Sequence, residues 1–400
     1  VGIGARADQG RVAHAARGGP PLLAEHPGAG EMLIGLSGVG AGDSLSLLFQ
    51  VAPGTNDPDA EVSPLQWSVL ASNYWRPLEP QEMQVDTTRD LRRSGLLAFA
   101  LPRETSIENT LMPTGMVWLR GMAARNANAV CELVNVHANG IELVSVEAQA
   151  SASLEPGVIS KAKAPPAIKK FQQPYAGFGG RPAEPADRVA ARAAERVRHR
   201  GRCVSAWDYE RAVLEAFPSL HRVKCLPHAS PDSWFAPGNV TLVVIPKTAG
   251  RGGDEHLRPR CSLDELEEIR AFAASRCGGQ TRVFARNPRH QQVLVACEIR
   301  LRPGLGFHFY AAQTDAALVS VLSPWASDET RSIEFGGGID RSSVLRFVEE
   351  LPFIESASRF KLLSVGPDGA IADQPRVEPM TPDSVLVSAP RHQITEYTGE

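Results

Sequence analysis

Residues 179–227 read GGRPAEPADRVAARAAERVRHRGRCVSAWDYERAVLEAFPSLHRVKCLP, and this stretch predicts a helix, a second helix and a strand. In the first half, Val189, Ala193 and Val197 recur at every fourth residue. That spacing places them on one face of a helix. Gly201 follows the last of these positions, where a glycine at C′ commonly ends a helix. The first predicted helix therefore runs from about 184 to 200.

The second half of the stretch carries a helix-start signal. Ser205 can cap a helix N-terminus while Asp208, three residues later, reaches back to the backbone of the cap residue. This helix is predicted to run to about Phe217, before a proline. The apolar run at 220–227 then reads as a strand.

Downstream, predicted helices alternate with predicted strands. The predicted strands are 239–246, 291–302 and 356–364, and the predicted helices begin at Ser262 (capping box with Glu265), at about 311 and at 341 (Asp340 as cap). The strand at 291–302 is the clearest, because Val293, Val295, Cys297 and Ile299 alternate with polar residues. Segments 220–285 and 291–364 therefore look like two α+β layers, which we describe as ferredoxin-like.

Upstream, short apolar runs are separated by Gly, Pro and Asn. They are 45–51, 65–72, 94–102, 115–123 and 129–148. Many short strands with turn signals indicate a sandwich-like β domain. Trp67 and Trp118 occupy period-2 positions in these runs, so we expect both to pack in its core.

The predicted fold class is α+β and multi-domain, with an N-terminal β-sandwich-like domain followed by a helical segment and two α+β layers. The expected divisions are an irregular arm (1–30), a β-rich domain (31–150), a linker (151–178), an α+β domain (179–290), a second α+β domain (291–365) and a tail with a possible edge strand (366–400). Because the first residue is Val1, we expect the chain to be a portion of a longer protein.

Composition argues against several classes of protein. The chain has 400 residues, a net charge of −3 and a pI of about 6.4, so no strong field favours DNA or an anionic membrane. No stretch has the ~20 apolar residues that span a bilayer. The six cysteines are scattered without a CxxC pair, which favours reduced, partly buried thiols and assembly in a cytoplasm.

Arginines dominate the first helix of the opening stretch. Residues 181–202 hold seven arginines against three acidic residues. Guanidinium forks suit bidentate carboxylate contacts at protein interfaces. We hypothesise that this helix faces a neighbouring subunit; the alternative is a solvated helix face with weak intrahelical pairs.

Two stretches carry a family resemblance. One is PLQWSVLASNYWRPLEPQEMQVDTTRDLRRSGLLAFALP (64–102), and the other is 179–227 with its Gly-Gly turn, Arg-rich helix and R-x-V-S-x-x-D-Y-E segment. Both resemble the baseplate J-like proteins of contractile phage tails and phage tail-like injection systems, and FGGGIDRSSVLRFVEELPFIESASRFKL (335–362) is similar to the family's closing helix and strand. There, Pro352-Phe353-Ile354 replaces the usual junction. The residues that carry the family motif, with an interface or structural role, are Gly179, Gly180, Arg181, Glu184, Arg192, Arg196, Arg198, Arg202, Ser205, Asp208, Tyr209 and Glu210.

The resemblance implies a structural wedge subunit. Such subunits pair with a second wedge protein, contact neighbouring wedges in a ring around the central spike, and meet hub and sheath proteins. They couple baseplate rearrangement to sheath contraction. They are assembled in the bacterial cytoplasm as part of a particle and can be released with it. The resemblance implies no nucleic-acid partner and no insertion into a membrane.

Enzyme and cofactor motifs are missing or incomplete, so we expect no catalytic residue, cofactor or metal. GVGAGD (38–43) lacks the spacing and the following helix of a dinucleotide site. Cys203 lies near Arg200 and Arg202, which could stabilise a thiolate, but it reads as a packing residue. The alternative function is a carbohydrate-binding or adhesin-like protein that uses Trp67, Tyr74, Trp75 and Trp118 on the β domain as an aromatic platform.

Overall fold

The computed structural model describes residues 28–144, 154–160, 168, 170–178, 184, 186–247, 257–326, 335–366 and 369–397. The chain divides into two compact units, one made of Val1–Gly140 together with Arg202–Glu400 and the other of Ile141–Gly201. Most elements in the described part are strands, accompanied by five α-helices. The mixed α+β class is confirmed, while the sandwich-like and ferredoxin-like descriptions and the domain boundaries stay predictions.

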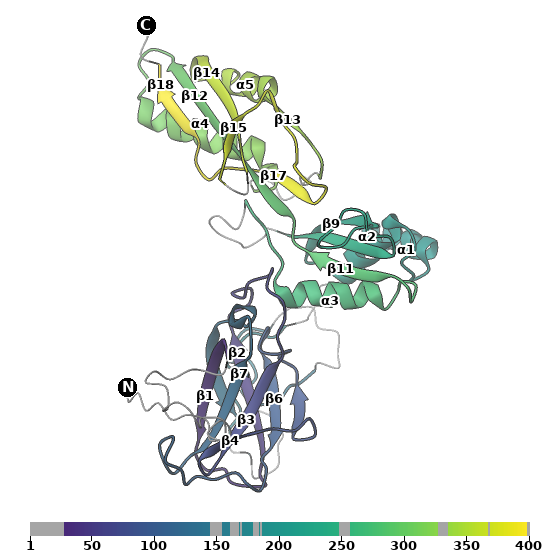
Figure 1. Cartoon of the computed structure of the whole chain (residues 1–400). Coiled ribbons are helices and arrows are strands. Elements are labelled where there is room, and N and C mark those ends of the chain that lie inside the picture. Colours follow the sequence, from purple (N-terminus) through teal and green to yellow (C-terminus); the bar gives the residue numbers. More distant parts are fainter. Residues whose placement is uncertain are drawn as a thin grey trace, which may run out of the picture. The chain divides into compact units, whose positions relative to one another are not determined.

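Two antiparallel four-stranded sheets build the N-terminal part of the larger unit (Figure 1). The first has the order β1 (Gly30–Leu36), β7 (Val117–Ala123), β3 (Leu65–Ala71) and β4 (Tyr74–Pro77). The second has the order β5 (Met83–Asp86), β6 (Gly95–Ala100), β2 (Ser44–Val51) and β8 (Leu133–Ala138).

Alternating apolar side chains of both sheets form one core. Along β2, Leu45, Leu47 and Phe49 are buried at every second position, as the pleat of a strand requires. The rings of Phe49 and Phe99 lie 6.0 and 5.2 Å from the Trp67 ring. Trp67 is buried, so its predicted place in the core is confirmed.

The corresponding prediction for Trp118 is wrong. Its neighbours Val117 and Leu119 are both completely buried in the core. Because side chains alternate across a strand, Trp118 points to the outer face. There its indole N–H donates to the carbonyl of Pro113 at 2.9 Å.

The predicted strand over 129–148 is shorter in the structure. A 3₁₀ turn covers Ala127–Ala129, and β8 ends at Ala138. Asn139 has a φ of 59°, which takes the chain out of the extended conformation. Residues 141–144 are exposed and not in a strand, and 145–148 lie outside the described residues.

The next elements form an α+β layer with two helices against a three-stranded sheet. They are α2 (Ala206–Ala216), β9 (Leu220–Pro227), β10 (Asn239–Pro246), α3 (Leu263–Ala274) and β11 (Arg282–Arg286). β10 lies in the centre, antiparallel to β9 and parallel to β11. Val213 of α2, Ile269 of α3 and Leu242 of β10 are all completely buried in the shared core. The predicted strands 220–227 and 239–246 are confirmed.

A second layer follows directly, because β12 (Arg289–Leu301) starts shortly after β11 ends. Its other elements are α4 (Phe307–Leu322), β13 (Ile339–Asp340), α5 (Arg341–Glu349), β14 (Ile354–Val365), β15 (Ile371–Asp373), β16 (Arg376–Val377), β17 (Ser384–Ser388) and β18 (Gln393–Glu396). The sheet order is β15-β14-β12-β17, and β18 also pairs with β12. The predicted alternation of Val293, Val295, Cys297 and Ile299 is confirmed, since all four are buried.

The C-terminal residues complete this layer. β17 pairs in parallel with the start of β12, and every one of its residues is buried. Residues of this C-terminal segment also cover one face of β10, the central strand of the first layer, whose other face packs against α2 and α3. Leu242 packs towards the helices, whereas Ile245 packs against Trp325, Val385 and Val387.

The unit Ile141–Gly201 contains the arginine-rich helix α1 (Ala186–His199). Gly201 has a φ of 70°, the left-handed conformation expected of a residue that ends a helix. The predicted helix and its predicted stop are therefore confirmed.

Candidate functional site

The residues singled out in the sequence fall into two groups in the structure. Glu184, Arg192, Arg196 and Arg198 belong to the unit Ile141–Gly201, whereas residues from Arg202 to Glu210 belong to the larger unit. Gly179, Gly180 and Arg181 lie outside the described residues. An interface role for either group stays a prediction.

Helix α1 presents both charge and apolar surface. The Nε of Arg192 donates to Glu184 at 2.7 Å, and both side chains are about one-third exposed. Arg196 and Arg198 are exposed in the last turn, where positive charge suits the helix dipole. Val197 is 75% exposed although it lies on the predicted apolar face. The helix thus shows a mixed apolar and basic surface.

Ser205 and Asp208 build the start of α2. The Ser205 hydroxyl accepts from the Asp208 N–H at 3.3 Å, and Asp208 Oδ2 accepts from the Ser205 N–H at 2.8 Å. This reciprocal pair is the predicted capping box. Arg202, three residues earlier, is exposed. Ser205 and Asp208 therefore have a structural role, because their hydrogen bonds stabilise the N-terminus of α2.

The next two motif residues also act inside the fold. Tyr209 is buried in the core beneath α2, and burial raises the pKa of its phenol. Glu210 Oε1 accepts the backbone N–H of Cys225 at 3.0 Å, which ties α2 to β9. The Asp-Tyr-Glu segment thus anchors this helix to its sheet.

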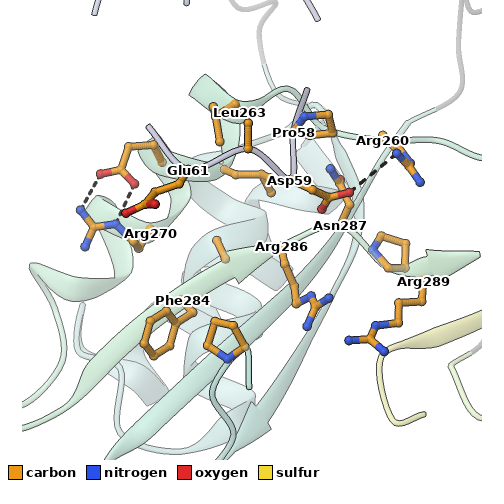
Figure 2. Close-up of a pocket in the computed structure, with 16 residues that line it drawn as sticks. Pro58, Asp59, Glu61, Arg260, Leu263, Arg270, Phe284, Arg286, Asn287 and Arg289 are labelled. Atoms are coloured by element: carbon orange, nitrogen blue, oxygen red, sulfur yellow. Dashed lines mark hydrogen bonds and ion pairs between the residues drawn. The ribbon is translucent and has the colours of Figure 1, made fainter. Parts of the chain in front are cut away.

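A pocket of about 630 Å³ lies between the loop at 58–61 and the α3–β11 layer (Figure 2). Its charged side chains largely have partners. Arg270 makes a bidentate contact with Glu267, with N–O distances of 2.8 and 2.5 Å, and this lowers the pKa of Glu267. Arg260 lies 3.9 Å from Asp59. Because these guanidinium groups already face carboxylates, the pocket is poorly suited to an anionic ligand.

Two further arginines of the pocket hold a buried carboxylate. Asp383 is completely buried, and its Oδ2 lies 3.4 Å from both Arg286 Nη1 and Arg289 Nε. Its Oδ1 accepts from the Thr381 hydroxyl at 2.5 Å. Asp383 precedes β17, so this cluster attaches the C-terminal strand to the junction of β11 and β12.

A serine, a histidine and an aspartate meet near the end of β17, but their hydrogen bonds differ from those of a catalytic triad. Ser388 Oγ lies 3.1 Å from His392 Nε2. Because His392 Nδ1 accepts the N–H of Val295 at 3.1 Å, the neutral ring carries its proton on Nε2 and donates it to Ser388. Asp315 accepts from the backbone N–H of His392 at 2.7 Å rather than from the ring. A general base at Nε2 needs the opposite tautomer.

Cys203 is unsuited to nucleophilic chemistry. Its side chain is buried in the core under α2. Burial raises the pKa of the thiol to about 11, so the reactive thiolate is disfavoured. Cys203 therefore packs, as predicted.

Sequence reasoning missed an aromatic loop between β9 and β10. Phe235 is 81% exposed and Trp234 is 40% exposed. The signal was present as the dipeptide Trp-Phe inside a polar, proline-bracketed connection, PDSWFAP (231–237). Aromatic residues are enriched at protein interfaces relative to the rest of the protein surface.

The sequence matches the protein family described as "Baseplate protein PVC11-like" over residues 24–374, which is most of the chain. The chain belongs to the PVC11-like baseplate proteins. This confirms the coarse prediction of a baseplate component and agrees with the prediction of a contractile injection system, while the baseplate J-like assignment is not confirmed. Membership of a structural family also agrees with the predicted non-enzymatic role.

The PVC11-like chain also has a structural likeness to a chain in "Cryo-EM structure of the anti-feeding prophage (AFP) baseplate, 6-fold symmetrised". The two are 18% identical, with a TM-score of 0.45, and the match covers 92% of this chain and 78% of the other. A comparison with curated proteins finds no match.

Among the described residues of the PVC11-like chain, no helix combines the length and apolarity needed to cross a membrane. No three His, Cys, Asp or Glu side chains in the same part of the chain are grouped so that they could hold a metal ion.

Proposed function

We propose that this PVC11-like protein is a wedge subunit of a contractile injection particle, with the architecture of baseplate J-like proteins. In this proposal it pairs with a second wedge protein, forms a ring with neighbouring wedges around the central spike, and contacts hub and sheath proteins. It assembles in the bacterial cytoplasm, and its role is to couple baseplate rearrangement to sheath contraction.

The observation that carries the proposal is the family match over residues 24–374. The surface of α1 supports an assembly role, because exposed Val197 lies among exposed arginines. Apolar contacts bordered by guanidinium groups are frequent at protein interfaces. We propose that α1 contacts a neighbouring subunit that presents carboxylates.

The carbohydrate-binding alternative receives less support from the placement of its aromatic residues. Trp67 is in the core, and the indole of Trp118 is engaged with Pro113. The guanidinium of Arg120 lies over Trp75, 4.9 Å from the ring centre. Tyr74, at 51% exposure, is the most accessible of the four rings, so a continuous open platform is not present.

The test reverses charge on α1 by the double substitution Arg192→Glu and Arg196→Glu. Particles expressed with this variant should lack complete rings, because repulsion replaces attraction across the proposed contact. Electron microscopy of purified particles measures ring formation, and circular dichroism of the isolated chain checks that it folds.

The matched control is Arg346→Glu, which reverses an arginine on α5 whose side chain is 81% exposed. That variant should form normal rings. Normal rings from the double α1 variant would refute the interface role of α1. Absence of the unmodified chain from purified particles would refute the wedge function itself.

A further inference from the structure

The loop at residues 228–238, between β9 and β10, exposes two aromatic side chains to solvent. Phe235 exposes 81% of its surface, and the adjacent Trp234 exposes 40%. Arg289 lies over the Trp234 ring, with its guanidinium carbon 5.9 Å from the ring centre. Among the described residues, no cation lies over the Phe235 ring in this way.

Hydrogen bonds hold this loop in one shape. Ser230 and Ser233 form a backbone bridge, with N–O distances of 2.8 and 3.3 Å. The Ser233 hydroxyl accepts from the Phe235 N–H and lies 3.2 Å from the Phe235 carbonyl oxygen, to which it donates. At the base, the Ala236 N–H donates to the His228 carbonyl at 2.5 Å. The Phe235 side chain is therefore presented by an ordered turn.

The backbone itself restricts the loop further. Pro231 and Pro237 each lock one φ angle. His228 and Gly238, at the two ends, adopt φ of 57° and 81°. The Thr241 hydroxyl, from within β10, donates to the Ala229 carbonyl at 2.9 Å and fixes the first turn to the sheet. Little conformational entropy is left to lose when such a loop binds a partner.

An exposed ring on a pre-organised turn has the properties of an interface anchor. Aromatic residues that enter a pocket contribute most of the affinity at many protein interfaces. Pre-organisation favours binding because the ordering cost is met during folding. A loop that served only to connect β9 and β10 would gain nothing from exposing Phe235 to water.

The charged residues in and beside the loop indicate which kind of partner it can bind. Residues 228–238 contain no lysine or arginine, and their one acidic residue is Asp232. The basic side chain that lies over Trp234, Arg289, is already paired with the buried Asp383, 3.4 Å away. Segments that enter lipid interfaces usually carry basic residues beside their aromatic ones. The loop therefore fits a protein surface better than an anionic bilayer.

We propose that Phe235 is an anchor that inserts into an apolar pocket on another protein chain of the assembled baseplate. This inference rests on the proposed function, since it needs the chain to be part of a baseplate. Trp234 then covers the rim of the contact, and the Ser233 hydroxyl keeps the anchor in its binding orientation.

Photo-crosslinking in purified particles tests the contact directly. Phe235 is replaced by p-benzoylphenylalanine in the full chain, the particles are irradiated, and mass spectrometry maps the products. The expected result is a crosslink from position 235 to apolar residues of another chain. Particles that contain the variant but yield no such crosslink overturn the inference, whereas particles without the chain count against the proposed function.

Competition for incorporation measures the strength of the contact. A tagged variant is co-expressed with the untagged parent chain, and mass spectrometry gives their ratio in particles. Phe235→Ala should be incorporated about 30-fold less, the factor that corresponds to loss of an anchor worth about 2 kcal/mol. Ser233→Ala, which loosens the turn, should show a smaller loss.

The matched control is Phe309→Ala, which removes a ring that is 63% exposed on α4. It should be incorporated like the parent, and equal losses for positions 235 and 309 overturn a specific anchor. Flotation with vesicles of phosphatidylcholine and phosphatidylglycerol supplies the other check. If the parent chain binds these vesicles and Phe235→Ala does not, Phe235 contacts lipid. That result would overturn the proposal that Phe235 inserts into a pocket on a protein.

Discussion

At the scale of single residues, Asp383 links parts of the chain that lie far apart in the sequence. Its completely buried carboxylate contacts Arg286 and Arg289, and the carbonyl of the preceding Pro382 accepts from Lys224 at 3.0 Å. A buried carboxylate needs such partners, because leaving it unpaired costs several kcal/mol. These contacts bring β9, the β11–β12 junction and the start of β17 together.

His290 gives this region a predicted sensitivity to acid. Burial, followed by the nearby Arg260 and Arg258, lowers the pKa of His290 to about 3 from an ordinary value of 6.5. As the pH falls through 6.5, His290 is protonated in the unfolded chain, whereas in the folded chain it stays neutral until about pH 3. Stability is therefore expected to fall across that window.

The substitution His290→Gln should reduce this acid sensitivity. Between pH 8 and pH 5 the free energy of unfolding should fall by about 1–2 kcal/mol less in the variant than in the parent. Urea unfolding at the two pH values, monitored by tryptophan fluorescence, measures the difference. An unchanged pH dependence would mean that His290 does not titrate in this way.

At the scale of elements, helix N-termini show which sequence signals are reliable. Ser262 and Glu265 form the predicted capping box of α3, with the Ser262 N–H donating to Glu265 at 2.8 Å. The predicted cap of α5 is only partly confirmed. Asp340 stands at the N-cap position, but its side chain makes no capping hydrogen bond and lies 3.4 Å from Arg376. A competing ion pair explains the difference.

Ser262→Ala should therefore lower the free energy of unfolding by about 1 kcal/mol, since a backbone N–H of α3 loses its acceptor. The matched variant Asp340→Ala should cost only a few tenths of a kcal/mol, because it removes no capping bond and only a solvent-exposed ion pair. Chemical denaturation of both variants measures the two losses. A larger loss for Asp340→Ala would contradict the contrast.

At the scale of the whole molecule, the two α+β layers share apolar surface. Val243 and Ile245 lie on the face of β10 that is turned away from α2 and α3, and both are completely buried. Ile245 packs with Trp325, Val385 and Val387, while Val243 packs with Leu226 and Ala229. The C-terminal residues thus cover a strand that lies more than a hundred positions earlier in the chain.

A chain that ends at Gln374 should therefore misfold or aggregate. It lacks β17 and β18, so Ile245 and the core side of β12 lose apolar cover. Solubility after expression and binding of an apolar dye measure the effect. The control is a chain shortened only by residues 398–400, which should behave like the full chain. The prediction would be contradicted if the chain that ends at Gln374 were soluble and did not bind the dye.

The sequence by itself determined the local features of this protein. The α+β class, helix α1 and its glycine stop, the capping boxes at Ser205 and Ser262, and the strands from 220 to 246 and at 291–302 were all predicted. Each follows from interactions within a few residues, such as periodic burial and backbone capping. The family resemblance of such stretches also led to the correct coarse class, a baseplate protein.

Only the tertiary structure decided which way side chains point and what covers them. It turned Trp118 outwards, placed Tyr209 in a core, bonded the Glu210 side chain to β9, and brought Asp383 to Arg286. It also exposed Phe235 on an ordered loop. These facts depend on strand register and on contacts between residues far apart in the chain, and local sequence patterns do not encode such contacts.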